Sequence, residues 1–141
     1  MPSDTQTAAV SNTQTAPVSK KRLWAGRILS ALPVLMLLFS GVLKLIKPAP
    51  VVEEFTRLGY PESLVLGIGL LELACTVVYA IPRTSIIGAI LLTAYLGGAT
   101  ATHVRIGDPF FAPIILGGLV WGGLFLRDDR LRALLPWRRL A

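Results

Sequence analysis

The chain has 141 residues, of which 53% are hydrophobic and 16% are charged, and its formal net charge is +6. This length allows one domain. The charged residues avoid four long apolar segments, which excludes an ordinary water-soluble core and predicts an all-α integral membrane four-helix bundle. The positive charges lie beside these segments, so we assign them to membrane orientation and expect no binding of nucleic acid.

The chain begins with a polar segment followed by a membrane anchor. Residues 1–19 are rich in Ser, Thr, Gln, Ala and Pro without an apolar period, which predicts a disordered tail. A basic triplet at 20–22 precedes the first expected span, over about residues 24–46, which Pro33 would kink. This apolar run is too long for a secretory signal and no small-residue cleavage site follows it, so we expect the anchor to be retained.

A short amphipathic segment follows the first span. Residues 51–58 carry their apolar side chains on one side and their charges elsewhere, which predicts a short interfacial helix closed by Gly59. Pro61 then suits the start of the second span, expected over about residues 62–81. The chain thus crosses back through the membrane after lying at its surface.

Two tight turns define the remaining spans. A turn at Pro82-Arg83 makes spans two and three an antiparallel hairpin, and Thr84 can cap the third span, over about 84–104. The fourth span is expected over about 109–126, with Asp108 as its N-cap and Pro109 as its first helical residue.

Counting the Lys and Arg residues orients the bundle. The ends of the spans nearest the termini carry ten of these residues and the opposite ends carry four. The positive-inside rule therefore places both termini in the cytoplasm. We divide the chain into a cytoplasmic tail (1–19), a four-span domain (20–126) and a basic interfacial tail with five arginines (127–141).

Small residues recur at helical spacing in the last two spans. Gly118 and Gly122 form a Gly-x-x-x-Gly pair on the fourth span, and Ala94, Gly98 and Thr102 repeat this spacing on the third. Such residues let helices approach closely. We expect ordinary contacts within one chain, with homo-oligomerisation through the fourth span as the alternative.

The most informative residue is a carboxylic acid within the second apolar run, Glu72. An ionisable group at the centre of a span costs roughly 2.5–3.5 kcal/mol on insertion scales, so we expect this side chain to face protein or trapped water and not lipid. Cys75, Thr76 and Tyr79 share its helix face, at i+3, i+4 and i+7. The alternative to a functional site is a protonated acid that only bonds neighbouring helices.

Other polar residues gather on neighbouring spans. Ser40 and Lys44 share a face of the first span, and Thr100 and His103 are neighbours on the third. Glu72 lies about 15 Å along its helix from the outer end, and the Lys44 stem can reach roughly 6 Å toward it. The alternative is that Lys44 extends outward to the headgroups. Our candidate ligand-binding set is Glu72, Lys44, His103, Ser40, Thr76, Tyr79 and Thr100.

Several kinds of chemistry find no support in the sequence. A lone histidine without a ligand cluster predicts no metal site. Cys75 is the only cysteine, so no Cys-x-x-Cys thiol pair exists within the chain. No phosphate-binding loop, nucleophile elbow or His-Glu-x-x-His pair is present, so no catalytic residue can be named.

Five segments resemble the DoxX-like family of small four-span bacterial membrane proteins, over roughly residues 38–126. The segments are Ser40-Gly41-Val42-Leu43-Lys44-Leu45, Leu58-Gly59-Tyr60-Pro61, Gly67 to Leu73, Ile81-Pro82-Arg83 and Ala101 to Asp108. The resemblance implies a four-helix bundle in the bacterial cytoplasmic (inner) membrane. It also implies a link to thiosulfate–quinone oxidoreduction or oxidative-stress complexes, with Lys44, Glu72 and His103 as site positions.

Three functions fit these observations. The first is an accessory subunit that binds a quinone or another hydrophobic small molecule, alongside other membrane redox subunits in the lipid bilayer. The second is a small transporter or proton relay that uses Glu72. The third is a structural scaffold or assembly factor, in which Glu72 only holds helices together.

Overall fold

The computed structural model describes residues 19–135, which form helices and turns without any strand in that range. The helices are α1 (Lys20–Ile46), α2 (Ala49–Arg57), α3 (Glu62–Ala80), α4 (Ser85–Arg105), α5 (Phe111–Arg127) and α6 (Asp129–Leu134). By length and composition α1, α3 and α4 can cross a membrane, and α5 is an apolar helix of 17 residues, at the short end of the spanning range. The expected all-α membrane bundle with a short helix between spans one and two is confirmed.

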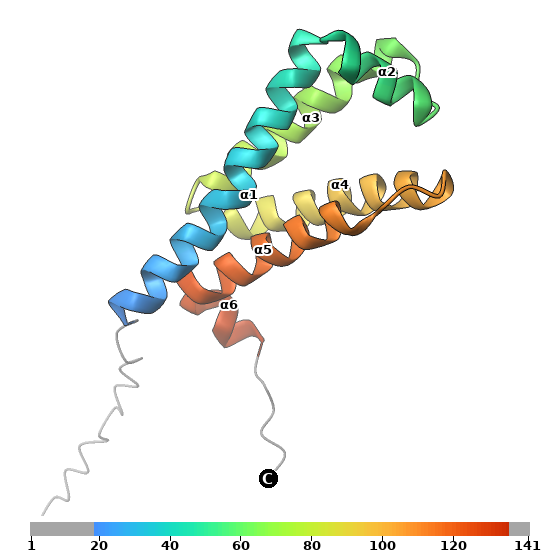
Figure 1. Cartoon of the computed structure of the whole chain (residues 1–141). Helices are drawn as coiled ribbons and strands as arrows, with labels where there is room; N and C mark the ends of the chain where they lie inside the picture. Colours follow the sequence, from blue (N-terminus) through green and yellow to red (C-terminus); the bar gives the residue numbers. More distant parts are fainter. Residues whose placement is uncertain (1–18, 136–141) are drawn as a thin grey trace, which may run out of the picture.

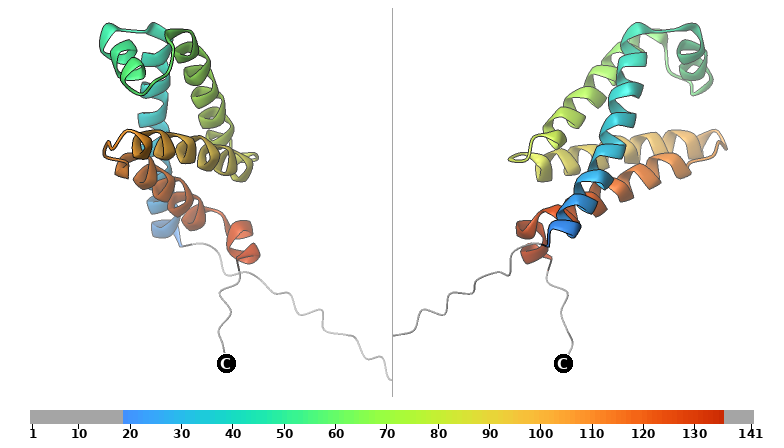
Figure 2. Two further views of the ribbon diagram at one scale, coloured as in Figure 1. Left: turned by 90° about the vertical axis from the view of Figure 1, so that its right-hand side faces the viewer. Right: turned by 60° about the vertical axis from the view of Figure 1, so that its left-hand side comes forward.

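The four long helices form a ring in chain order. α1 packs beside α3 and α5, and α4 packs beside the same two helices. The α1–α3 pair and the α4–α5 pair meet near the chain termini and diverge toward their opposite ends, where α2 lies (Figure 1; Figure 2). We call the region around Tyr79, Leu92 and Leu124 the terminal half of the bundle. The region around Lys44, Glu72 and His103 is the turn half.

The terminal half is closely packed around Tyr79, Leu92 and Leu124, whose side chains have no exposed surface. A Cβ atom added to Gly88 would lie 2.2 Å from the backbone nitrogen of Tyr79, and one added to Gly123 would lie 2.4 Å from Ser30 Oγ. Glycine at these positions therefore lets α4 approach α3, and α5 approach α1, at backbone distance.

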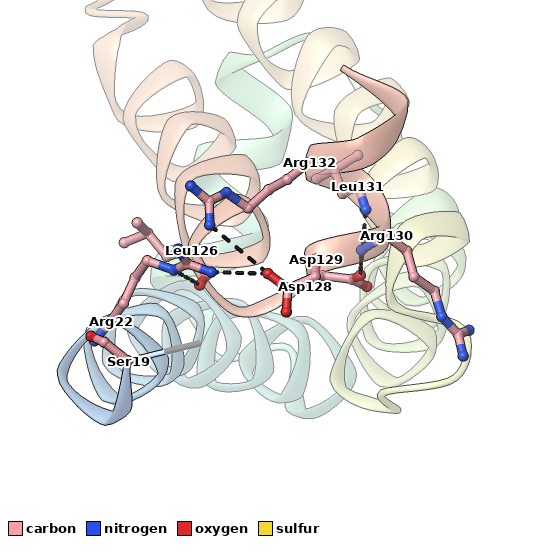
Figure 3. A network of polar contacts seen from close by, with 8 residues as sticks. All are labelled: Ser19, Arg22, Leu126, Asp128, Asp129, Arg130, Leu131 and Arg132. Carbon is pink, nitrogen blue, oxygen red and sulfur yellow. Dashed lines mark hydrogen bonds and ion pairs between the residues drawn. The ribbon is translucent and has the colours of Figure 1, made fainter. Parts of the chain in front are cut away.

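A polar network ties the two ends of the described chain together (Figure 3). The Ser19 hydroxyl caps α1 by accepting from the Arg22 backbone at 3.3 Å. The Arg22 side chain donates to the Leu126 carbonyl oxygen and pairs with Asp129 at 2.9 Å. Asp128 caps α6 by accepting from the backbone of the next turn. The start of α1 is thereby fixed to the end of α5.

The helix ends differ slightly from the sequence expectations. α1 begins at Lys20 and not near residue 24, because its capped first turn continues beyond the apolar run. Thr84 is the N-cap of α4 as expected, but its hydroxyl donates to the Val78 carbonyl oxygen instead of capping that helix.

The expected start of the fourth span was wrong. α5 begins at Phe111 with Phe110 as its N-cap, so Asp108 and Pro109 lie in the preceding turn. This turn contains Gly107 at φ 74°, and the Asp108 carboxylate pairs with Arg57 instead of capping α5.

The expected contacts of the Gly-x-x-x-Gly pair within the chain were also wrong. In the range 19–135, no atom of another element lies within 4 Å of a Cβ added at Gly118, Gly122 or Gly98. The first two therefore lie on a part of α5 that no other helix covers. The alternative, homo-oligomerisation, stays a prediction.

Nothing is described of residues 1–18 and 136–141, so most of the expected disordered tail and the end of the basic tail lie outside the described range.

Candidate functional site

The site begins at the crossing of α1 and α3, where two glycines face each other. A Cβ on Gly69 would lie 2.7 Å from the Lys44 Cβ, and one on Gly41 would lie 2.6 Å from the Leu73 side chain. The absence of side chains at both positions allows the helices to cross closely. This crossing brings the Lys44 stem directly over α3, one turn from Glu72.

Lys44 and Glu72 form an ion pair inside the bundle. Lys44 Nζ lies 2.7 Å from Glu72 Oε2 and donates to Ser40 Oγ at 2.5 Å. The Ser40 hydroxyl in turn donates to the same carboxylate oxygen at 3.4 Å. Glu72 is 2% exposed and the Lys44 side chain 13%, so the acid is sheltered from lipid, as expected. Such a pair makes each partner depend on the other, because either charge left alone would be buried without compensation.

The pair lies in the wall of a cavity of about 580 Å³ between the two diverging helix pairs. Most of the wall is apolar. Its apolar lining residues are Met36, Leu37, Phe55, Leu58, Ile68, Leu71, Ala94, Leu96, Gly98, Ala99, Ala112, Pro113 and Leu116. A hollow of this size with a few polar groups is typical of small-molecule sites.

Polar side chains from three other elements also line this cavity. Tyr95 on α4 lines the same cavity as Glu72. Tyr60, in the turn after α2, shares a hydrogen bond of 3.0 Å with the hydroxyl of Thr102 on α4. Glu54 on α2 completes this set. The cavity wall therefore carries hydroxyl groups and a second carboxylate in addition to the buried ion pair.

In the turn half, the end of the cavity is bridged by contacts of α2 and Leu58 with the end of α4 and the turn that follows it. Arg57 Nη1 lies 2.5 Å from Asp108 Oδ2, and the Arg105 side chain donates to the Leu58 carbonyl oxygen. The contacts of Arg57 with Glu54 and with Asp108 raise the pKa of its guanidinium, a group that is charged at physiological pH even without such contacts. These contacts hold α2 over the cavity.

His103 stands out among the cavity residues because one of its ring nitrogens is free. Within the described part of the chain, Nδ1 is buried and has no hydrogen-bond partner, with Asp108 Oδ2 3.8 Å away. Buried polar atoms in proteins nearly always have a partner. The Asp108 carboxylate oxygen lies just beyond hydrogen-bond distance, so a small movement of either side chain would satisfy this nitrogen.

Four residues of the sequence-predicted set line the cavity, namely Ser40, Lys44, Glu72 and His103. The other three bond elsewhere. The hydroxyls of Thr76 and Thr100 donate to carbonyl oxygens of their own helices, at 2.7 and 2.8 Å. The Tyr79 hydroxyl donates to the Val120 carbonyl oxygen at 2.8 Å and hydrogen-bonds with Ser30. Thr76 and Tyr79 share the face of Glu72, but they lie deeper, in the terminal half.

Sequence reasoning missed Tyr60, Tyr95 and Thr102 as cavity residues. Tyr95 and Thr102 are seven residues apart, with Gly98 and Ala99 between them, which is a small and polar face of one helix. That spacing was a usable signal. Tyr60 lies in a turn, where no period points to its partner.

The arrangement does not resemble a metal centre. Among residues 19–135, no group of three His, Cys, Asp or Glu side chains is placed to hold a metal ion. Cys75 is buried. The cavity is suited instead to an organic molecule with an apolar body and polar atoms at its edge.

Comparison with known proteins identifies one related group. The model of the DoxX-like family matches residues 28–123, a range that contains every residue lining the cavity. Searches of curated proteins and of solved structures gave no significant match.

Proposed function

Because the chain belongs to the DoxX-like family and folds as a membrane bundle, we propose that it binds a quinone-like hydrophobic molecule as an accessory subunit of a membrane redox or stress-response system. The observation that carries this proposal is the cavity of about 580 Å³, with apolar walls and polar groups from α1, α3 and α4. Ligand sites for small molecules fall between about 300 and 1,000 Å³.

The polar groups match the chemistry of a quinone ring. A quinone is neutral and offers carbonyl oxygens that accept hydrogen bonds. Lys44 on α1 and His103 on α4 both line the cavity and supply potential donors on different helices. Because the Lys44–Glu72 pair carries no net charge, a neutral ligand would meet no uncompensated ion beside it.

The supply of electrons would fall to another protein. With a single cysteine in the chain and no metal-binding cluster among residues 19–135, these residues hold the ligand and orient it. This supports a role beside other redox subunits. From the distribution of Lys and Arg we further propose a location in the bacterial cytoplasmic membrane, with both termini in the cytoplasm.

Proton relay is less well supported than binding. A relay from Glu72 to the terminal end would cross the region of Tyr79, Leu92 and Leu124, whose side chains have no exposed surface. The Tyr79 hydroxyl there is already engaged by Val120 and Ser30. The packing of the terminal half therefore favours a closed pocket over a path.

The test is a binding measurement in lipid nanodiscs. The probe is a dimethoxy-methyl benzoquinone with a decyl chain, added to wild type, Glu72→Gln and His103→Ala. We expect at least a tenfold loss of affinity in both variants. Ala101→Ser is the matched control, because Ala101 is an exposed residue of the same α4 turn outside the cavity.

Other outcomes separate the competing functions. No binding to wild type contradicts the proposal. Variants that bind the probe normally but melt at lower temperature indicate a scaffold. Proton flux into sealed vesicles that is lost in Glu72→Gln indicates a relay.

A further inference from the structure

A second hollow, of about 510 Å³, lies between α1 and α2. The residues that line only this hollow are apolar: Phe39, Leu43, Pro50 and Val51. Phe39 is 68% exposed, which in a spanning helix means exposure to hydrocarbon. We call this hollow the α1–α2 groove.

The groove and the ligand cavity share a wall. Five residues line both hollows: Met36, Ser40, Lys44, Glu54 and Phe55. The two spaces therefore meet at one layer of side chains. Met36 belongs to this layer, and an unbranched thioether side chain can move aside at little cost.

Polarity changes across this shared wall. Glu72, the acid of the buried ion pair, lines the cavity and not the groove, whereas the four residues that line only the groove are all apolar. A molecule that spans both spaces would need a polar head and an apolar extension. The extension would leave the protein at the side, between α1 and α2, and continue in the bilayer.

Resting on the function proposed above, we propose that the ligand is a lipid with a long hydrocarbon tail. Its head occupies the cavity beside Lys44 and His103, and its tail lies in the α1–α2 groove. The two hollows adjoin through five shared residues, which supports this occupant over a helix of a second copy, because such a helix would fill the groove without entering the cavity.

The test compares two probes with the same ring. One is a dimethoxy-methyl benzoquinone without a tail, and the other carries a decyl chain. Val51→Trp from α2 and Leu43→Trp from α1 fill the groove with an indole ring. We expect at least a tenfold loss of affinity for the tailed probe and less than a twofold change for the tail-less one, in nanodiscs.

Val42→Trp is the matched control, because Val42 is exposed beside Leu43 and lines neither hollow. A second readout uses the wild-type protein and does not depend on the folding of any variant. A photoreactive diazirine at the end of the decyl chain should label the groove peptides that contain Phe39, Leu43 or Val51.

Two results would overturn the assignment of the tail to the groove and leave the proposed function unaffected. In the first, neither groove variant changes the affinity for either probe. In the second, the groove variants lose the same affinity for both probes. Labelling confined to other peptides does the same. If neither probe binds to wild type, the proposed function itself fails.

Discussion

The terminal half and the turn half of the bundle consist of the same four helices, yet they pack in opposite ways. In the terminal half, a Cβ on Gly88 would collide with the α3 backbone at 2.2 Å. In the turn half of the same helix, no atom of the described chain outside α4 lies within 4 Å of a Cβ on Gly97 or Gly98. The same residue type thus serves close packing at one end and borders open space at the other.

The two halves also treat their polar groups differently. Tyr79 in the terminal half has fixed protein partners in Val120 and Ser30. In the turn half, Lys44 and Glu72 satisfy each other at a cavity wall, and His103 keeps a free nitrogen within the described range. The terminal half is therefore stabilised by close packing of its side chains. The turn half is packed less closely and keeps polar groups at a cavity wall, where they can contact a ligand.

The largest expected effect lies at the buried ion pair. Lys44→Met leaves Glu72 in the cavity wall without its cation, and we expect a loss of about 3–5 kcal/mol in unfolding free energy. The measurement is denaturation in mixed micelles followed by circular dichroism. The double variant Lys44→Met/Glu72→Leu should recover most of this loss. A double variant as unstable as the single one would show that the pair does not act as a unit.

The glycines of α4 provide the next test. Gly88→Ala should cost roughly 1–3 kcal/mol or more, because the added methyl group forces α4 away from the Tyr79 backbone. Gly97→Ala should be neutral or stabilising by up to about 1 kcal/mol, since alanine favours the helix and meets no neighbour. Thermal melting of both variants in the same detergent checks this. Equal effects would contradict the contrast between the halves.

The smallest expected effect concerns two tyrosine hydroxyls. Tyr79→Phe removes the fully buried hydrogen bond that the hydroxyl donates to the Val120 carbonyl oxygen, which should cost about 1–2 kcal/mol. Tyr60→Phe removes a partly exposed bond to Thr102 and should cost under about 0.5 kcal/mol. Hydrogen exchange of the α3 amides separates the two variants, because only Tyr79→Phe should raise the exchange rates in the terminal half.

Hydropathy and turn residues predicted the fold well, because spanning segments are set by local composition. The Glu72 position also followed from the sequence, since an acid in a span must face the interior. The cavity did not follow. Gly41 and Gly98 are both glycines within apolar spans. Leu73 packs against Gly41, whereas no atom of another described element lies within 4 Å of a Cβ on Gly98, which lines the cavity.

Helical periodicity also could not show how far along the bundle a residue lies from the cavity. The i+4 and i+7 rule correctly placed Thr76 and Tyr79 on the face of Glu72. It could not show that the bundle closes one turn below the acid, so these two residues bond within the core and not in the cavity. Asp108 was expected to cap the fourth span. Its carboxylate instead pairs with Arg57, a residue distant in sequence that local turn patterns do not indicate.

The ring order of the helices has a consequence for biogenesis. α1 leaves the ribosome before α3 and α5, and it packs beside both of them. The α3–α4 hairpin can insert as a unit, but the α1–α5 seam with its Gly26 and Gly123 contacts cannot form until translation of α5 ends. Nascent chains arrested before residue 111 would therefore expose one flank of α1, a surface on which an insertase or quality-control protease can act.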